Sequence, residues 1–268
     1  MQKVVFITGV SSGFGKSIAE ILSSKGYFVY GTSRKNTENN LPYTVIKADV
    51  MDPTSIKIAT DKVIKKEGHI DILINNAGMG ISGAIEDFSV EDIKLQMGTN
   101  VMGVVNTVQA VLPSMRRRMS GLIINFSSIG GIMGLPFQGF YSASKFAVEG
   151  LSQALRMELR QFDIKVVVVE PGDFSTNFTA NRKFVLDPTV YSAYKEQFNK
   201  TISIIEKDEL GGLPPDFLAR KLCNIIEKSN PCHRYVISTL EQKFAVFLKC
   251  ILPDAWFFKI LASHYGIK

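Results

Sequence analysis

The sequence has little cysteine and no long apolar run. Its three cysteines (Cys223, Cys232 and Cys250) form no CxxC pair, and their odd number argues against a disulfide framework. No uncharged apolar stretch reaches the roughly 18 residues that a transmembrane helix needs. The first residues run directly into a strand-like segment and lack the architecture of a signal peptide. We therefore expect a protein of the reducing cytoplasm.

Charge of one sign is not concentrated in the chain either. The formal net charge is +6, which would favour anionic ligands, nucleic acid or an acidic membrane surface. The main arginine run, Arg116 to Arg118, falls at the expected end of a helix and is interpreted first as a solvated face. Nucleic-acid binding would rest on net charge alone, so none is expected, and no metal site is predicted.

The chain does contain short β-branched runs that alternate with helical patterns. Continuous apolar strands alternating with helices predict a parallel sheet that is covered on both faces. The predicted fold class is therefore α/β, a doubly wound parallel sheet of Rossmann type in a single domain, 1–268. Strands are expected at 3–8, 28–32, 44–48, 70–75, 121–127, 165–170 and 235–238, and helices at 15–25, 53–67, 90–118 and 141–162.

Two segments depart from this rhythm. Residues 174–215 are rich in Phe, Asn, Thr and Pro, and we expect them to form a lid over the carboxyl ends of the strands. Residues 240–268 form an apolar C-terminal extension, in which 244–265 reads as two short amphipathic helices. Three interpretations of this extension remain open: it packs on the domain, it forms a subunit interface, or it rests on a membrane surface.

A glycine turn follows the first strand, in Thr8-Gly-Val-Ser-Ser-Gly-Phe-Gly15. Its three glycines permit a tight turn, close approach of the backbone to a ligand, and close packing of helix on strand. The helix that follows offers free N–H groups and a positive dipole end to a phosphate. We predict nucleotide binding here, the alternative being a purely structural turn.

A tyrosine and a lysine stand four residues apart in GFYSASKFAVEG. On a helix, Tyr141 and Lys145 lie on one face, one above the other. By themselves they allow two interpretations: a catalytic pair, or a tyrosine lying over a lysine stem, which is common on helices.

Five motifs together resemble the short-chain dehydrogenase/reductase family. The turn has the GxxxGxG spacing of that family, and Asn75 to Gly78 and Asn100 to Gly103 resemble its NNAG and NVxG motifs. Ser128, Tyr141 and Lys145 match the spacing of the family's catalytic triad, and Pro171-Gly172 with Thr176 matches its PGxxxT motif. The motifs occur in the family's order, and the match is loose only from about residue 210 onward.

The resemblance implies a catalytic role for four residues. Tyr141 would act as general acid/base, and Lys145 would favour its phenolate, lower its pKa and bind the nicotinamide ribose. Ser128 would hydrogen-bond the substrate oxygen and help to stabilise developing charge, with Ser127 as the competing candidate. Asn100 would organise a water-linked proton relay through Lys145, the alternative being a polar residue that kinks a helix.

The cofactor is predicted from the end of the second strand, where a carboxylate would repel a 2′-phosphate. Ser33 holds that position, and Arg34 and Lys35 follow, so NADP(H) is favoured over NAD(H), the alternative being a solvated basic loop. Asp49 and Val50 resemble the family's adenine-contacting pair, although Asp49 could equally cap the helix at 53. The predicted cofactor residues are Gly9, Ser11, Ser12, Gly13, Phe14, Gly15, Ser33, Arg34, Asp49, Val50, Asn76, Ala77, Gly78, Tyr141, Lys145, Pro171, Gly172 and Thr176.

The stretch GGIMGLPF before Tyr141 is similar to the 17β-hydroxysteroid and retinol dehydrogenase branch of the family. This similarity implies a lipophilic carbonyl or alcohol substrate that is steroid-like, retinoid-like or long-chain. Reduction of 3-oxoacyl or 3-ketosphinganine-type substrates is the enzymatic alternative, and Arg116 to Arg118 is a faint docking patch for an acyl carrier. The expected apolar wall consists of Met133, Leu135, Phe137, Phe140, Phe174 and Phe178.

Two further expectations follow from the resemblance. Family members pair through their two long helices, here 90–118 and 141–162, so a homodimer or homotetramer is implied. A non-enzymatic nucleotide-sensing protein is disfavoured, because Tyr141 and Lys145 are both present.

Overall fold

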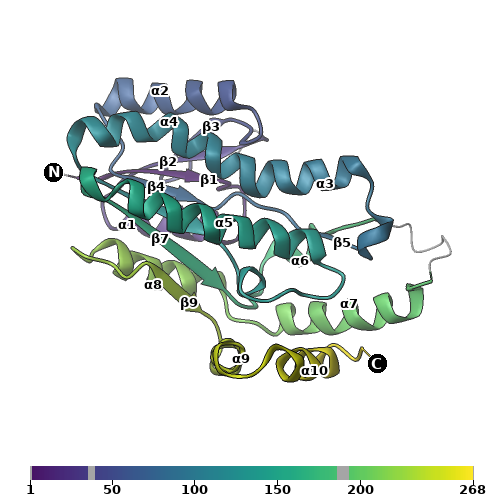
Figure 1. Ribbon diagram of the computed structural model, residues 1–268. Helices are drawn as coiled ribbons and strands as arrows, with labels where there is room; N and C mark the ends of the chain where they lie inside the picture. The colour runs from purple at the N-terminus through teal and green to yellow at the C-terminus, as the bar shows by residue number, and fades with distance from the viewer. Residues whose placement is uncertain (1, 36–39, 186–192, 268) are drawn as a thin grey trace.

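The structure, a computed structural model, describes residues 2–35, 40–185 and 193–267. Seven parallel strands form one sheet in the order β3-β2-β1-β4-β6-β7-β9, with helices on both faces (Figure 1). The predicted fold class is confirmed. The strands of this sheet are β1 (Val4–Thr8), β2 (Phe28–Ser33), β3 (Thr44–Lys47), β4 (Ile72–Asn75), β6 (Gly121–Phe126), β7 (Ile164–Pro171) and β9 (Arg234–Ile237).

The first strand explains why both faces of the sheet are covered. All five residues of β1 are buried, and successive side chains point to opposite faces. Val5 and Ile7 belong to a core that includes residues of α1 and α8. Val4 and Phe6 belong to a second core, with α2, α4 and α5. These helices are α1 (Gly13–Ser24), α2 (Pro53–Glu67), α4 (Gly103–Arg118), α5 (Gly139–Glu158) and α8 (Pro215–Ile226).

The single long helix expected at 90–118 is interrupted. It consists of α3 (Val90–Met97), a π-helical segment Gly98–Met102, and α4. A π segment inserts an extra residue into a helical turn, and such segments occur often at functional sites. The helix expected at 141–162 also differs, because α5 begins at Gly139, ends at Glu158 and is followed by a short 3₁₀ turn.

The strand order reverses between β1 and β4, which are neighbours in the sheet. In open α/β sheets, ligands bind in the crevice outside the carboxyl ends of the strands at such a switch point. The segment expected to form a lid contributes α6 (Asn177–Ala180), β8 (Lys183–Phe184) and α7 (Lys195–Leu210), while 186–192 lie outside the described residues. Strand β8 pairs with β5 (Ile81–Ser82) in a separate two-stranded sheet.

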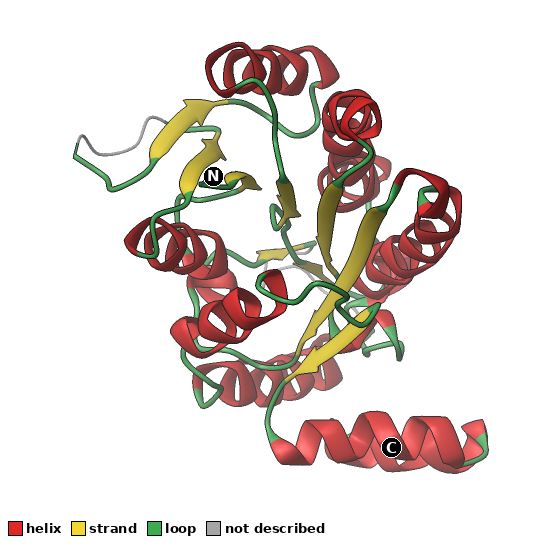
Figure 2. Cartoon of the chain, turned by 90° about the vertical axis from the view of Figure 1, so that its left-hand side faces the viewer, coloured by secondary structure: helices red, strands yellow, loops and turns green. Residues whose placement is uncertain are grey.

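The C-terminal extension forms two short helices, α9 (Leu240–Ile251) and α10 (Asp254–His264), as the sequence predicts. In both views they lie along the outside of the molecule, beyond β9 and α8 (Figures 1 and 2). Among the helices of the described ranges, none is long and apolar enough to cross a membrane.

Candidate active site

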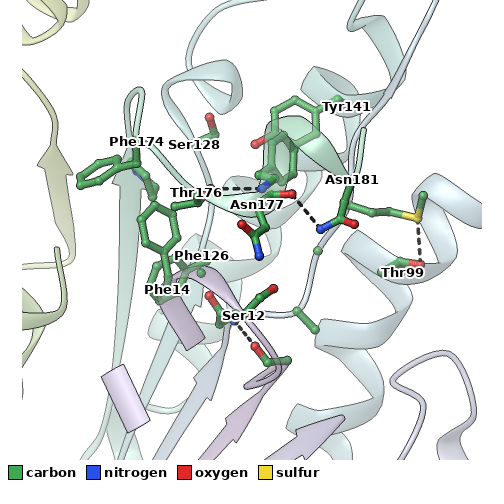
Figure 3. A pocket seen from close by; sticks show the side chains of 18 of the residues that line it. Ser12, Phe14, Thr99, Phe126, Ser128, Tyr141, Phe174, Thr176, Asn177 and Asn181 are labelled. Carbon is green, nitrogen blue, oxygen red and sulfur yellow. Dashed lines mark hydrogen bonds between the residues drawn. The ribbon is translucent and has the colours of Figure 1, made fainter. Parts of the chain in front are cut away.

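A cavity of about 820 Å³ lies at the carboxyl ends of the central strands. The glycine turn, the ends of β2, β4, β6 and β7, and the 174–215 segment all contribute to its wall. In Figure 3, Ser12 of the glycine turn lies on one side of the cavity, and Ser128 and Tyr141 lie on the other. Of the predicted catalytic and cofactor residues, all but Gly15 and Asn100 line it.

The glycine turn owes its shape to its glycines and to Asn76. Gly9 and Gly13 adopt φ values of +74° and +55°, a region that side chains other than glycine rarely enter. A Cβ on Gly15 would lie 2.1 Å from the carbonyl oxygen of Gly9. Asn76 Nδ2 donates to the carbonyls of Thr8 and Gly9 at 2.9 Å each. Gly15 therefore lies beneath the turn and supports it, rather than facing the cavity.

The N-terminus of α1 is left free for a ligand. Its N-cap residue, Ser12, makes no capping hydrogen bond through its side chain, and the first turn has no acidic residue. Two neighbouring helices begin differently: Asp52 accepts from Thr54 N at 2.8 Å at the start of α2, and Ser89 accepts from Asp92 N at 3.0 Å at the start of α3. Free N–H groups and a positive dipole end at a cavity wall fit a pyrophosphate.

The end of β2 carries no carboxylate. Ser33 is buried, and its Oγ accepts a hydrogen bond from Lys35 N at 3.2 Å. Arg34 and Lys35 both line the cavity beside it. Two cations and a hydroxyl at this position fit a 2′-phosphate, since a carboxylate there would repel one.

Asp49 lines the same part of the cavity. Its Oδ1 accepts from Met51 N at 3.0 Å, within its own loop. The alternative role considered for Asp49, capping the helix at 53, is wrong, because Asp52 is the N-cap of α2.

Tyr141 and Lys145 lie side by side on α5, as their spacing predicts. Lys145 Nζ is 5.7 Å from the centre of the Tyr141 ring and donates to the carbonyl of Phe126 at 2.9 Å. Ser128 and Tyr141 both lie against Gly130, and Ser128 Oγ accepts from Gly130 N at 3.1 Å. The hydroxyl of Ser127, the competing candidate, instead donates to the main-chain carbonyl of Lys145, with 3.4 Å between the two oxygens. The geometry favours Ser128 as the partner of Tyr141.

Burial controls the pKa values of this pair. It raises the pKa of Tyr141 to about 12, and the nearby Ser128 hydroxyl opposes that rise only in part. Burial also lowers the pKa of Lys145 to about 8. The sequence predicts a lowered pKa for Tyr141, but in the chain by itself desolvation dominates and raises that pKa. At neutral pH Tyr141 is therefore a phenol, which can donate a proton to a forming alkoxide.

Asn100 lies in the π-helical segment, behind the cavity wall. Its Oδ1 accepts from Met79 N at 2.9 Å, and its Nδ2 donates to Met79 O and to Ser144 Oγ at 3.0 Å each. A Cβ on Gly78 would lie 3.4 Å from Asn100 Oδ1 and 3.7 Å from Lys145 Nζ. Gly78 thus occupies the narrow space between Asn100 and Lys145, and only its lack of a side chain keeps that space open.

Half of the expected apolar wall does not face the cavity. Leu135, Phe174 and Phe178 line it. Met133 is buried in the protein interior. The centre of the Phe137 ring lies 5.4 Å from that of Phe198, and the centre of the Phe140 ring lies 4.8 Å from that of Phe88. The sequence could not separate these two groups, because the loop before α5 is irregular and has no period from which side-chain direction follows.

Five ionisable residues of the cavity wall are missing from the sequence prediction: Asp173, Lys183, Asp208, Glu209 and Tyr265. Burial, with Glu209 and Asp208 nearby, raises the pKa of Asp173 to about 6. Gln242 donates to the Asp173 carboxylate, and Arg182 and Thr179 donate to that of Glu209. Asp173 directly follows the Pro171-Gly172 motif, which is a usable signal, whereas nothing local marks Asp208, Glu209 or Tyr265.

Comparison with known proteins identifies the family. The model of the short chain dehydrogenase family matches residues 3–184. The chain is 46% identical over 266 residues to a 3-ketodihydrosphingosine reductase of Bacteroides thetaiotaomicron, with 99% of both chains covered. It is 32% identical over 273 residues to an NADPH-dependent 3-dehydrocapnine reductase of Ornithobacterium rhinotracheale, covering 97% of this chain and 96% of that one.

A solved structure of the same family has a similar fold. The crystal structure of a short-chain dehydrogenase from Streptomyces avermitilis superposes with a TM-score of 0.80 at 31% identity, covering 90% of this chain and 91% of that one. The glycine turn, the switch-point cavity and the Ser128, Tyr141 and Lys145 cluster all lie within this shared fold. The chain belongs to the short-chain dehydrogenase/reductase family of oxidoreductases.

Proposed function

We propose that this protein reduces the ketone of a long-chain amino ketone of the 3-ketodihydrosphingosine type, with NADPH as reductant. The observation that carries the proposal is the 46% identity, over nearly the full length of both chains, to a 3-ketodihydrosphingosine reductase. This identity favours a long-chain substrate among the lipophilic carbonyl compounds predicted from the sequence. It supports the ketosphinganine alternative over a steroid or retinoid substrate.

The preference for NADPH is supported at the end of β2. Arg34 and Lys35 lie where a 2′-phosphate would need cations, and Ser33 offers a hydroxyl there. The relative of Ornithobacterium rhinotracheale is described as NADPH-dependent. When bound, the cofactor supplies the hydride. The free N–H groups of α1 would hold its pyrophosphate, and Thr176 would reach its carboxamide.

The residues of the chain would supply the proton and stabilise charge. The Tyr141 hydroxyl would donate its proton to the ketone oxygen as that oxygen gains negative charge, and Ser128 would donate a second hydrogen bond. The Lys145 ammonium, held by the Phe126 carbonyl, would favour the phenolate left on Tyr141. Asn100 would maintain the route by which a proton returns to this pair.

The opposite wall of the cavity suits the amino end of the substrate. A 3-keto sphingoid base carries a 2-ammonium group and a 1-hydroxyl beside the ketone. Asp173 and Glu209 both act on Tyr141, and Glu209 is already paired with Arg182, so a cation bound at Asp173 would lie near the reacting carbonyl. Leu135, Phe178 and Ile205 would contact the alkyl chain.

The proposal is tested by following loss of NADPH absorbance with a panel of ketones. The panel contains 3-ketodihydrosphingosine, the same ketone without its amine, a 3-oxoacyl thioester, retinal and a steroid ketone. We expect the highest kcat/KM for the amino ketone, and lower values for the ketone without the amine. Equal rates for the steroid ketone or retinal would contradict the substrate class while leaving the family assignment intact.

We also propose a homodimer or homotetramer that pairs through α4 and α5. Phe146 and Met157 are exposed on α5 and lie at helical spacing. Met102, the residue just before α4, is exposed as well. Exposed apolar side chains on two long neighbouring helices suit helix-to-helix packing between subunits. Sedimentation analysis of Met157→Glu beside the unmodified protein tests this pairing.

A further inference from the structure

The C-terminal helices carry an apolar stripe that the proposed chemistry does not use. The C-terminal apolar stripe consists of Leu240, Phe244, Phe247 and Ile251 of α9, with Trp256 and Ile260 of α10. The four residues of α9 follow at intervals of four, three and four, so they share one face of the helix. All six are exposed, from 52% for Ile260 to 82% for Leu240.

The other side of these helices is fixed to the enzyme. Two hydrogen bonds join Gln242 of α9 to Asp173. Gln242 Nε2 donates to the Asp173 carboxylate, and Gln242 Oε1 accepts from Asp173 N at 3.2 Å. Phe257 of α10 is buried, and the carbonyl of Tyr265 accepts from Thr201 Oγ1 at 3.2 Å. The stripe is therefore the outer face of a pair of helices that are attached to the enzyme through Gln242, Phe257 and Tyr265, although no residue of α9 is buried.

Positive charge borders the stripe. Lys243 and Lys259 are exposed and make no ion pair among the residues that the structure describes, while one exposed acidic residue, Glu241, lies beside Leu240. Aromatic and aliphatic side chains on one face with lysines beside them are typical of helices that lie in the membrane interface. A second copy of the chain fits less well, because an isologous contact would bring each stripe against its own copy, with the bordering lysines on both sides.

We propose that the C-terminal apolar stripe docks this protein on an anionic lipid bilayer, next to the entrance of its cavity. The inner side of the same helices reaches the cavity wall, through the contact of Gln242 with Asp173 and through Tyr265, which lines the cavity. A long-chain amphiphile dissolves in membranes rather than in water. Docking at this place would let the substrate pass from bilayer to cavity with little exposure of its chain to water.

Vesicle sedimentation without any substrate tests the docking, so its result does not depend on the proposed function. The vesicles contain phosphatidylcholine alone or with phosphatidylglycerol. The double variant Phe244→Glu/Phe247→Glu and the single variant Phe244→Glu are compared with Ile58→Glu, which places one glutamate at an exposed apolar position of α2. We expect the unmodified protein and Ile58→Glu to bind anionic vesicles, and the double variant to bind at least about tenfold more weakly.

A second pair of measurements separates the lipid from other occupants. Lys243→Glu/Lys259→Glu should weaken binding to anionic vesicles and leave the weak binding to neutral vesicles unchanged. Failure of the unmodified protein to sediment with vesicles would overturn the proposal. So would conversion of an oligomer to monomers by Phe244→Glu/Phe247→Glu without any change in vesicle binding, because the stripe would then belong to a subunit interface.

An activity assay connects docking to the substrate. With the ketone embedded in vesicles, Phe244→Glu/Phe247→Glu should lose activity in proportion to its lost binding. With a short-chain, water-soluble analogue, it should match the unmodified enzyme. If neither ketone is turned over by any form while vesicle binding persists, the proposed function fails and the docking surface stands.

Discussion

The two ends of the cavity are built from different kinds of parts. The end proposed for the cofactor consists mainly of main chain and small side chains, namely the glycine turn, the free N-terminus of α1 and Ser33, with the Arg34 and Lys35 cations at its edge. The end proposed for the substrate consists of large and ionisable side chains: Tyr141, Phe178, Asp173 and Glu209. The first end holds its shape through backbone geometry, and the second through burial and charge.

This difference has a consequence for substitution. Where N–H groups and glycines make the site, a change acts through the turn itself and affects every ligand that binds there. Where individual carboxylates and rings make it, a single change can alter one property, such as recognition of an amine, and leave the rest intact. The following predictions test that separation, from the largest expected effect to the smallest.

Tyr141→Phe should show the separation most clearly. We expect turnover to fall by about three orders of magnitude or more, because the proton donor is lost, while the affinity for NADPH stays within about twofold. Single-turnover kinetics measure the turnover, and fluorescence titration measures the affinity for NADPH. Tyr235→Phe, on β9 and outside the cavity wall, is the matched control. Retained turnover would remove Tyr141 from the mechanism.

Arg34→Ala should act only at the cofactor end. We expect KM for NADPH to rise by about one to two orders of magnitude and KM for NADH to change little, since only NADPH carries the 2′-phosphate. The same alanine change at exposed Arg160 is the control. Equal effects on the two cofactors would refute the assignment of Arg34 to the phosphate.

Asp173→Asn should act only at the substrate end. We expect about a tenfold rise of KM for the amino ketone, and little change for the ketone without its amine. In the unmodified enzyme, the preference for the amino ketone should weaken as pH falls through about 6, where Asp173 becomes protonated. Asp61→Asn on the exposed face of α2 controls for loss of charge. A shift of KM for both ketones would assign Asp173 a structural role instead.

The same residue should also affect stability. Because burial raises the pKa of Asp173 to about 6, its folded form binds protons more tightly than its unfolded form. Its contribution to the free energy of unfolding is therefore fully present below pH about 4 and is lost as pH rises through about 6. At pH 8 we expect the free energy of unfolding of Asp173→Asn, measured by denaturant titration, to exceed that of the unmodified protein by about 1 kcal/mol. At pH 4 we expect no such gain. Equal differences at both pH values would exclude titration of Asp173 as the cause.

Much of the fold and of the cofactor end could be predicted from the sequence. Apolar strands alternating with helices determine a parallel sheet, and a glycine turn between strand and helix lies at its carboxyl edge whatever the rest of the chain does. The i,i+4 spacing of Tyr141 and Lys145 brings them together because a helix repeats every 3.6 residues. Such features depend on local geometry, which neighbouring residues encode.

The tertiary structure alone decided the rest, for two physical reasons. Asp208 and Tyr265 reach the cavity wall from α7 and from beyond α10, and no local pattern records which distant helices pack at the mouth of a sheet. The pKa of Tyr141 depends on how much water the fold removes around it, and here burial is the largest influence and raises that pKa. Spacing along the chain thus determined which residues are neighbours on one element, whereas packing between elements determined their charge and their surroundings.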